Sequence, residues 1–152
     1  MIKKLLAISL TVFTLSTNVY ASDKHHFPGV FLGATTIDSE TDFSWGLEYE
    51  YKFADKWGAG VVYEETDDAH DNAGVEVKLA SLYFHPINHL RLGLGAGEEK
   101  VKGHHGHEED LVRISASWEI PVSSFEIAPT LAYDFVDGNT SVVTGIAIIY
   151  PF

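Results

Sequence analysis

Residues 45–53 read Trp-Gly-Leu-Glu-Tyr-Glu-Tyr-Lys-Phe, from Trp45 to Phe53, and this stretch decides the fold. Side chains alternate between the two sides of a β-strand, so one face here is aromatic and aliphatic while the other holds glycine and charges. Related patterns recur along the rest of the chain. Repeated alternation of this kind is typical of a membrane β-barrel with an apolar outside and a polar inside.

The first residues have the features of an export signal. Lys3 and Lys4 precede an apolar run from Leu5 to Leu15, and a polar segment ending in Ala21 predicts cleavage before Ser22. The run is too short for a spanning helix, which needs about 20 apolar residues. A retained N-terminal anchor is the alternative. We expect a signal peptide at 1–21 and one barrel domain at 22–152.

Composition excludes several classes of protein. The chain has 10 basic and 22 acidic residues, a formal charge of −12, and removal of the signal makes it two units more negative. Such a chain repels phosphates, so we expect no nucleic-acid partner. It has no cysteine, which excludes a disulfide framework and thiolate chemistry.

The alternation predicts an all-β fold, an eight-stranded antiparallel up-and-down transmembrane β-barrel. The expected strands are Pro28–Ile37, Asp42–Phe53, Trp57–Glu65, Gly74–His85, Leu90–Glu99, Leu111–Ile120, Phe125–Val136 and Thr140–Phe152. Short turns should face the periplasm with both termini, and the mostly longer, acidic connections should face outward. Two positions fit poorly: Ser81 falls on the lipid face of its strand, and Pro129 lacks an N–H donor, which suggests a bulge.

The face opposite the lipid face collects charged side chains and glycines. An eight-stranded barrel is just wide enough for its own side chains, so these charges should pair with one another. The predicted interior charge network is Glu48, Glu50, Lys52, Glu64, Glu76, Lys78, Arg91, Arg113, Glu119, Glu126 and Asp134. Lys52 and Arg91 should lie near the periplasmic end, and Lys78 and Arg113 higher in the barrel. A salt-bridge plug is the main interpretation, and a selective ion path is the alternative.

These features together resemble the small eight-stranded outer-membrane barrels of the OmpA/OmpX-like β-barrel domain family. The resemblance covers the mature chain by pattern and implies no catalytic signature. It implies an assembly signal made by the terminal Phe152 and by Tyr150, read by the barrel assembly machinery. Ala147 stands where the family usually has glycine, and Pro151 is unusual so close to the end.

The histidine-rich segment 103–110 is the candidate metal site. Imidazoles beside carboxylates are ligands for Zn²⁺, Ni²⁺ or Cu²⁺, and glycines would let the segment fold around an ion. The candidate ligands are His104, His105, His107 and Glu108. A solvated polar loop and a lipopolysaccharide contact bridged by divalent cations are the alternatives. His85 and His89 flank a short turn, and we interpret them as turn or interface residues.

Catalysis is not expected. The chain lacks the His-x-Ser pair of lipid A deacylase barrels, and it also lacks Gly-x-Ser-x-Gly, His-Glu-x-x-His and a phosphate loop. We predict a small monomeric outer-membrane barrel in contact with lipid and lipopolysaccharide, with a structural or minor binding role. The competing architecture is a soluble periplasmic barrel, like a lipocalin, whose apolar face would line a ligand cavity.

Overall fold

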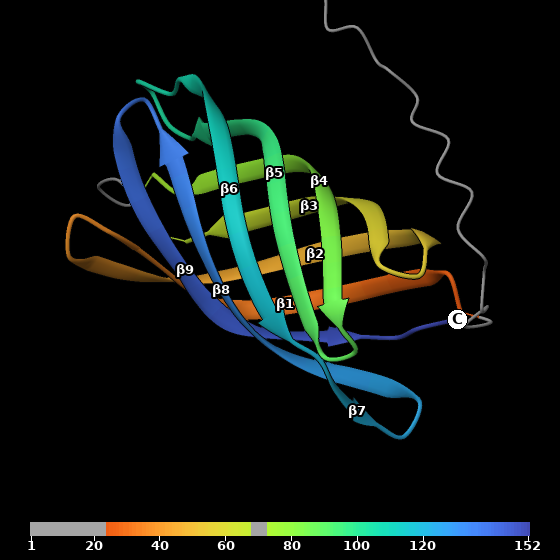
Figure 1. Ribbon diagram of the computed structural model, residues 1–152. Helices are drawn as coiled ribbons and strands as arrows, with labels where there is room; N and C mark the ends of the chain where they lie inside the picture. The colour runs from red at the N-terminus through yellow and green to blue at the C-terminus, as the bar shows by residue number, and fades with distance from the viewer. Residues whose placement is uncertain (1–23, 68–72) are drawn as a thin grey trace, which may run out of the picture.

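The computed structural model describes residues 24–67 and 73–152, which form one antiparallel sheet closed on itself (Figure 1). The predicted signal peptide at 1–21 lies outside these residues. The strands are β1 His26–Ile37, β2 Glu40–Ala54, β3 Trp57–Thr66, β4 Val75–Ile87, β5 Leu90–Val101, β6 Glu108–Trp118, β7 Ile120–Val122, β8 Phe125–Val136 and β9 Asn139–Ile149. In addition to the pairs along the chain, β1 pairs with β9 and β6 with β8, which closes the barrel. Within the described part, no helix is long and apolar enough to cross a membrane.

β6 and β7 are two pieces of one strand. Ser117 faces Thr130 and Ile120 faces Ile127, so the register along β8 is the same for both pieces. The ladder is interrupted opposite Pro129, which has no N–H to donate. No extra residue is inserted, and the predicted bulge at Pro129 is therefore wrong. The predicted eight-stranded antiparallel barrel is confirmed.

The first described residues and Phe152 lie at one end of the barrel, together with the short turns after β2, β4 and β7. There, the backbone N–H groups of His25 and His26 donate to the carbonyl of Phe152 at 3.2 and 2.9 Å. We call this the terminal end and the opposite end the loop end. At the loop end, φ is positive at Asp38 and Ser39 and at Asp137 and Gly138. These pairs form two-residue hairpin turns whose twist matches the flanking strands.

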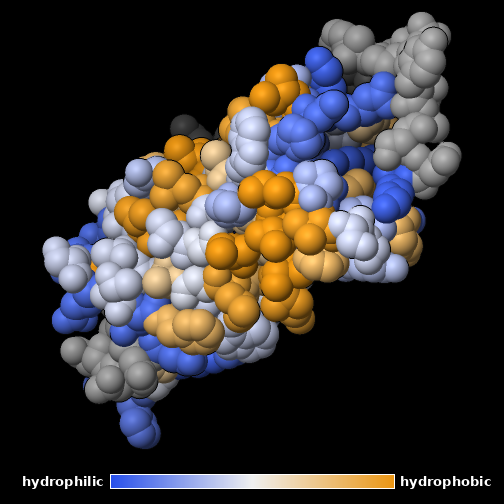
Figure 2. All heavy atoms as spheres, turned by 90° about the horizontal axis from the view of Figure 1, so that it is seen from below, coloured by the Kyte–Doolittle hydropathy of each residue, from blue (hydrophilic) through white to orange (hydrophobic). Residues whose placement is uncertain are grey.

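The outer wall is apolar. The large hydrophobic side chains exposed on it include Leu32, Leu47, Tyr49, Tyr51, Val61, Leu82, Leu92, Leu94, Ile114, Leu131, Tyr133, Ile146 and Ile148. Figure 2 shows hydrophobic residues gathered across the middle of one face of the barrel, with hydrophilic residues toward both ends. The competing architecture, with the apolar face around an internal cavity, is therefore wrong for this chain.

Inside the barrel, apolar layers separate the polar ones. A cluster of Val75, Val77, Leu79, Val101, Leu111 and Val136 fills the loop end. Phe27, Ala128, Ala147 and Ile149 form a second cluster near the terminal end. Beside the loop-end cluster, Ser44 on β2 bonds Thr35 on β1 at 2.7 Å and Thr66 on β3 at 2.8 Å. The interior is thus packed like a core rather than left open as a pore.

Candidate functional site

Two buried arginines organise the charges inside the barrel. Arg113 on β6 is buried and lies between Glu64 on β3 and Asp134 on β8. Its Nε and Nη2 atoms donate to the two oxygens of Asp134 at 2.6 and 2.7 Å, and its Nη1 and Nη2 atoms donate to Glu64. Bidentate pairing of this kind is the geometry in which arginine binds a carboxylate most strongly. This cluster links strands on opposite sides of the barrel.

The second arginine, Arg91 on β5, lies nearer the terminal end. Its Nη2 donates to Glu48 at 2.9 Å and to the hydroxyl of Ser117 at 3.4 Å. It approaches Glu50 at 3.6 Å and Glu119 at 3.8 Å, distances too long for hydrogen bonds. Its guanidinium also lies over the ring of Tyr83, 5.0 Å from the centroid. Three carboxylates therefore share one arginine.

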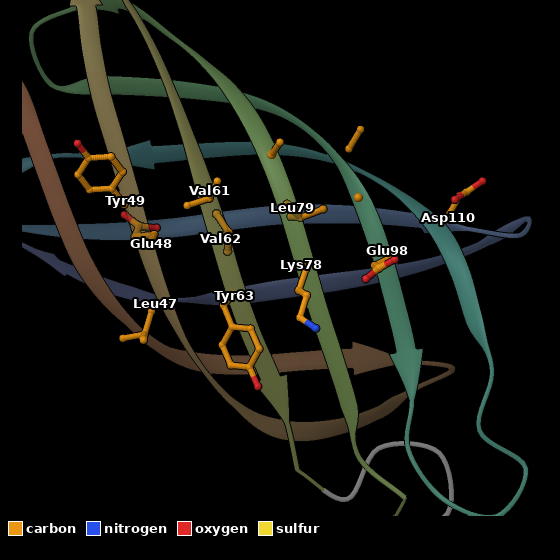
Figure 3. Close-up of a pocket in the computed structure, with 13 residues that line it drawn as sticks. Leu47, Glu48, Tyr49, Val61, Val62, Tyr63, Lys78, Leu79, Glu98 and Asp110 are labelled. Carbon is orange, nitrogen blue, oxygen red and sulfur yellow. The ribbon is translucent and has the colours of Figure 1, made fainter. Parts of the chain in front are cut away.

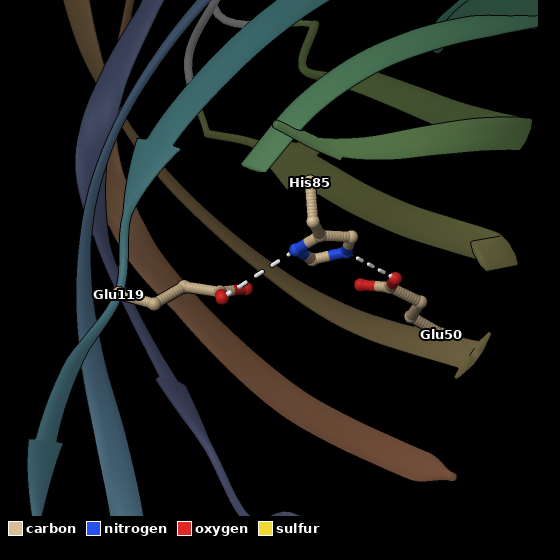
Figure 4. Close-up of side chains that lie close together, drawn as sticks. All are labelled: Glu50, His85 and Glu119. Atoms are coloured by element: carbon tan, nitrogen blue, oxygen red, sulfur yellow. Dashed lines mark hydrogen bonds and ion pairs between the residues drawn. The ribbon is translucent and has the colours of Figure 1, made fainter. Parts of the chain in front are cut away.

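His85 near the end of β4 completes this second cluster. Its side chain is buried, and Figure 4 shows the imidazole between Glu50 and Glu119. Nε2 lies 2.7 Å from Glu50 Oε1, and Nδ1 lies 3.7 Å from Glu119 Oε2. One ligand atom from each of these three side chains lies within 4.8 Å of the others. Elsewhere in the described ranges, 24–67 and 73–152, no group of three such side chains is this compact.

The faces of β4 are the reverse of those expected, and Glu76 and Lys78 were wrongly placed inside. Val77 and Leu79 are buried, whereas the Lys78 side chain is 55 % exposed and pairs with Glu76 at 2.6 Å on the outer wall. The loop-end interior is apolar, so charges in this part of the strand turn outward. The reversal also moves Ser81, Tyr83 and His85 inside, which removes the misfit at Ser81.

The same reversal explains why His85 was missed as an interior residue. A signal was present: Ala80, Leu82 and Phe84 are all apolar, while Ser81, Tyr83 and His85 all carry a polar atom. The charges of Glu76 and Lys78, near the start of the strand, favoured the opposite prediction for its inner face. His89 is exposed as expected for a turn residue, with its ring beside Trp118.

The other predicted network residues lie on the inner face. The Lys52 ammonium lies 4.0 Å from the centroid of the Phe27 ring at the terminal end. Glu126 has an oxygen, Oε2, that is buried and accepts no hydrogen bond. Glu48 lies with Arg91, because on β2 it is two residues closer to the terminal end than Gly46, the residue that pairs with Glu64.

The histidine-rich loop between β5 and β6 is exposed. His104, His105, His107 and Glu108 are all exposed residues. His107 lies 3.7 Å from Glu109, and Glu108 lies 3.6 Å from Lys100. These four candidate ligands are not brought together as a metal site in this arrangement.

Tyr150 and Phe152, the predicted assembly signal, follow β9 at the terminal end. Both side chains are exposed on the outer wall, and Phe152 stacks on His26 with ring centroids 5.2 Å apart. The Tyr150 N–H donates to the carbonyl of Pro28, and the Phe152 N–H donates to that of His26, both at 2.9 Å. The terminal residues therefore continue the pairing of β9 with β1.

A shallow groove of about 830 Å³ marks the outer wall over β2 to β6 (Figure 3). Ala80 and Ala96 leave room at its centre, while Leu47, Tyr49 and Val61 line one side. Tyr63, Lys78, Glu98 and Asp110 lie toward the loop end of the groove. The interior is far tighter: the space between the two arginine clusters is about 30 Å³. That volume holds no more than one or two waters.

Comparison with known proteins identifies the class of fold. No family model and no curated protein matches the sequence. Solved structures do match: Neisserial surface protein A has a TM-score of 0.61 at 10 % identity, covering 86 % of this chain and 98 % of its own. The N-terminal β-barrel domain of Pseudomonas aeruginosa OprF has a TM-score of 0.60 at 14 % identity, with coverages of 85 % and 99 %.

A third neighbour is Ail, the attachment invasion locus protein of Yersinia pestis, with a TM-score of 0.55 at 18 % identity and coverages of 85 % and 97 %. Ail has also been determined as an outer-membrane protein in a phospholipid bilayer nanodisc. The chain therefore has the fold of the small eight-stranded outer-membrane β-barrels.

Proposed function

We propose that the protein is a small, monomeric outer-membrane β-barrel whose interior is sealed and whose role is structural or a minor surface-binding one. The observation that carries the proposal is the pairing of an apolar outer wall with an interior filled by ion pairs. In water, such a wall would be an aggregation hazard, because soluble monomers rarely expose large contiguous apolar patches. In lipid, the same wall is the stable arrangement.

A sealed interior supports a non-conducting barrel over the ion-path alternative. Arg113, Glu64 and Asp134 span the lumen, and apolar clusters lie toward both ends. An ion would have to break buried pairs whose separated charges cost several kcal/mol, by the general cost of buried unpaired ions. The names of two structural neighbours, a surface protein and an attachment invasion locus protein, support a role at the cell surface.

The expected partners are lipid, lipopolysaccharide and the barrel assembly machinery. The groove on the outer wall would accommodate an acyl chain against Ala80 and Ala96. Charged pairs toward the loop end, Lys102 with Glu65 at 3.0 Å and Lys78 with Glu76 at 2.6 Å, would lie at the level of polar headgroups. Tyr150 and Phe152 would be read during assembly. The divalent-metal site at His104, His105, His107 and Glu108 stays a prediction.

Cell fractionation followed by gel electrophoresis tests the proposal. We expect the full-length protein in the outer-membrane fraction, with an unboiled band that migrates differently from the boiled one, because a closed barrel resists detergent unfolding. As a matched variant, Leu82→Lys places a charge in the apolar wall and should destabilise the barrel by about 2 to 4 kcal/mol if that wall faces lipid. Recovery of the protein as a soluble species without a heat-dependent shift would contradict the proposal.

A further inference from the structure

We infer that Glu50, His85 and Glu119 form a binding site for one divalent transition-metal ion, such as Zn²⁺, inside the terminal end of the barrel. The inference goes beyond the proposed function and does not involve the histidine-rich loop, which lies at the opposite end. The three residues come from β2, β4 and the junction of β6 with β7, so only the closed barrel brings them together.

Several buried carboxylate oxygens at this end lack hydrogen-bond partners. In the parts of the chain that the structure describes, three buried side-chain oxygens accept no hydrogen bond: Glu50 Oε2, Glu119 Oε1 and Glu126 Oε2. All three are at the terminal end. Glu50 is 1 % and Glu119 3 % exposed, so water does not compensate them. Glu50 Oε2 and Glu119 Oε1 lie 3.6 and 3.8 Å from Arg91, too far for hydrogen bonds, so both carboxylates keep unused capacity to bind a cation.

The charges at the terminal end also favour a bound cation. Four carboxylates, on Glu48, Glu50, Glu119 and Glu126, share this end with the interior cations Arg91 and Lys52. These carboxylates outnumber Arg91 and Lys52, so an added positive charge, carried either by a proton on His85 or by a metal ion bound to it, would stabilise this end. Arg91 holds Glu48 by a hydrogen bond and only approaches Glu50 and Glu119, so the carboxylates of Glu50 and Glu119 stay available to a metal beside the imidazole.

The geometry needs one side chain to turn, because Glu50 lies at Nε2 and Glu119 at Nδ1, on the two edges of the same imidazole (Figure 4). A tetrahedral ion with bonds of about 2.0 to 2.2 Å holds neighbouring ligand atoms roughly 3.4 Å apart. The candidate ligand atoms lie within 4.8 Å of one another, and His85 Nε2 to Glu50 Oε1 is 2.7 Å. An imidazole with two carboxylates suits Zn²⁺ and leaves a fourth position for water. The ion would replace the proton now shared by His85 and Glu50, so binding should release a proton.

Titration of the purified full barrel, first stripped with a chelator, tests the inference. We expect one Zn²⁺ per chain by calorimetry, and Co²⁺ absorption bands of a tetrahedral site. Glu50→Gln and Glu119→Gln should each weaken binding by roughly 100-fold or more, since residues that merely support a ligand already contribute 10- to 100-fold. His85→Gln should abolish the Co²⁺ bands. The heat-dependent gel shift verifies that each variant is closed.

The loop variant with His104, His105 and His107 all changed to alanine is the matched control, and it should bind Zn²⁺ like the unaltered protein. Two results would overturn the inference. One is a closed, unaltered barrel that takes up no Zn²⁺, which would mean that a proton alone bridges His85 and Glu50. The other is uptake that survives in both the Glu50→Gln and the Glu119→Gln variant, or that disappears in the loop variant.

Discussion

At the scale of single residues, each buried arginine compensates carboxylates that would otherwise be destabilising. Arg113 is the better paired of the two, with hydrogen bonds to both of its carboxylates. Among the carboxylates beside it, Arg91 forms a hydrogen bond with Glu48 alone and approaches two others. The two clusters therefore differ in hydrogen bonding: both carboxylates beside Arg113 are bonded to it, whereas two of the three beside Arg91 are not.

Replacing Arg113 by methionine should be strongly destabilising. The change leaves Glu64 and Asp134 buried without a cation, and breaking such a pair typically costs about 3 to 5 kcal/mol. We expect a lower urea midpoint for barrel unfolding, followed by tryptophan fluorescence in detergent. Lys100→Met is the control, because the pair of Lys100 with Glu108 is 3.6 Å long and more than half exposed. Exposed pairs contribute about 1 kcal/mol or less, so equal losses in both variants would argue against a buried network.

At the scale of a strand, alternation fixes which residues share a face but leaves open which face is inside. For β2 the sequence indicates which face is inside, because an entirely aromatic and aliphatic face opposes a charged one. The structure confirms this assignment. In β4 the charges of Glu76 and Lys78 lie beyond the apolar wall, where an outward charge costs little. Nearer the terminal end of β4, polar Ser81 alternates with apolar Leu82, and this pattern indicates the correct faces.

Cysteine labelling of β4 tests this reversal directly. The chain has no cysteine of its own, so a single introduced thiol gives a clean readout. Lys78→Cys should react quickly with a water-soluble maleimide in the folded barrel, because that side chain is 55 % exposed on the outer wall. Val77→Cys should react only after unfolding, because Val77 is buried in the loop-end cluster. The opposite order of reactivity would support the faces predicted from the sequence, with Lys78 inside the barrel.

Much of the fold could be predicted because strand pairing and alternation are local and periodic. The strand boundaries lie within a few residues of those expected, and Glu64, Arg113 and Asp134 lie inside as expected. The cluster at His85 could not be predicted, since its members are brought together by strand register around the closed barrel. Register across non-neighbouring strands leaves no mark in sequence spacing.

At the scale of the whole molecule, the packed lumen predicts an electrically silent protein. The space between the arginine clusters is about 30 Å³, and the Arg113 cluster lies directly across the path. Reconstituted into a planar lipid bilayer at high salt, the barrel should give no discrete current steps. A preparation of Arg113→Ala that stays closed by the gel assay provides a comparison with a widened lumen. Reproducible unitary currents from the unaltered protein would support the ion-path alternative.

The seam between β1 and β9 has a consequence for how the chain comes to be folded. The carbonyl of Phe152 accepts hydrogen bonds from the backbone of His25 and His26, so the segment that follows β9 is bonded to the segment that precedes β1. The barrel cannot close until β9 has paired with β1, and two unpaired strand edges stay open until then. Such edges invite pairing with other chains, and contacts between distant residues form slowly. We therefore expect that a chain without β9 would keep an open sheet whose two exposed edges associate with other chains.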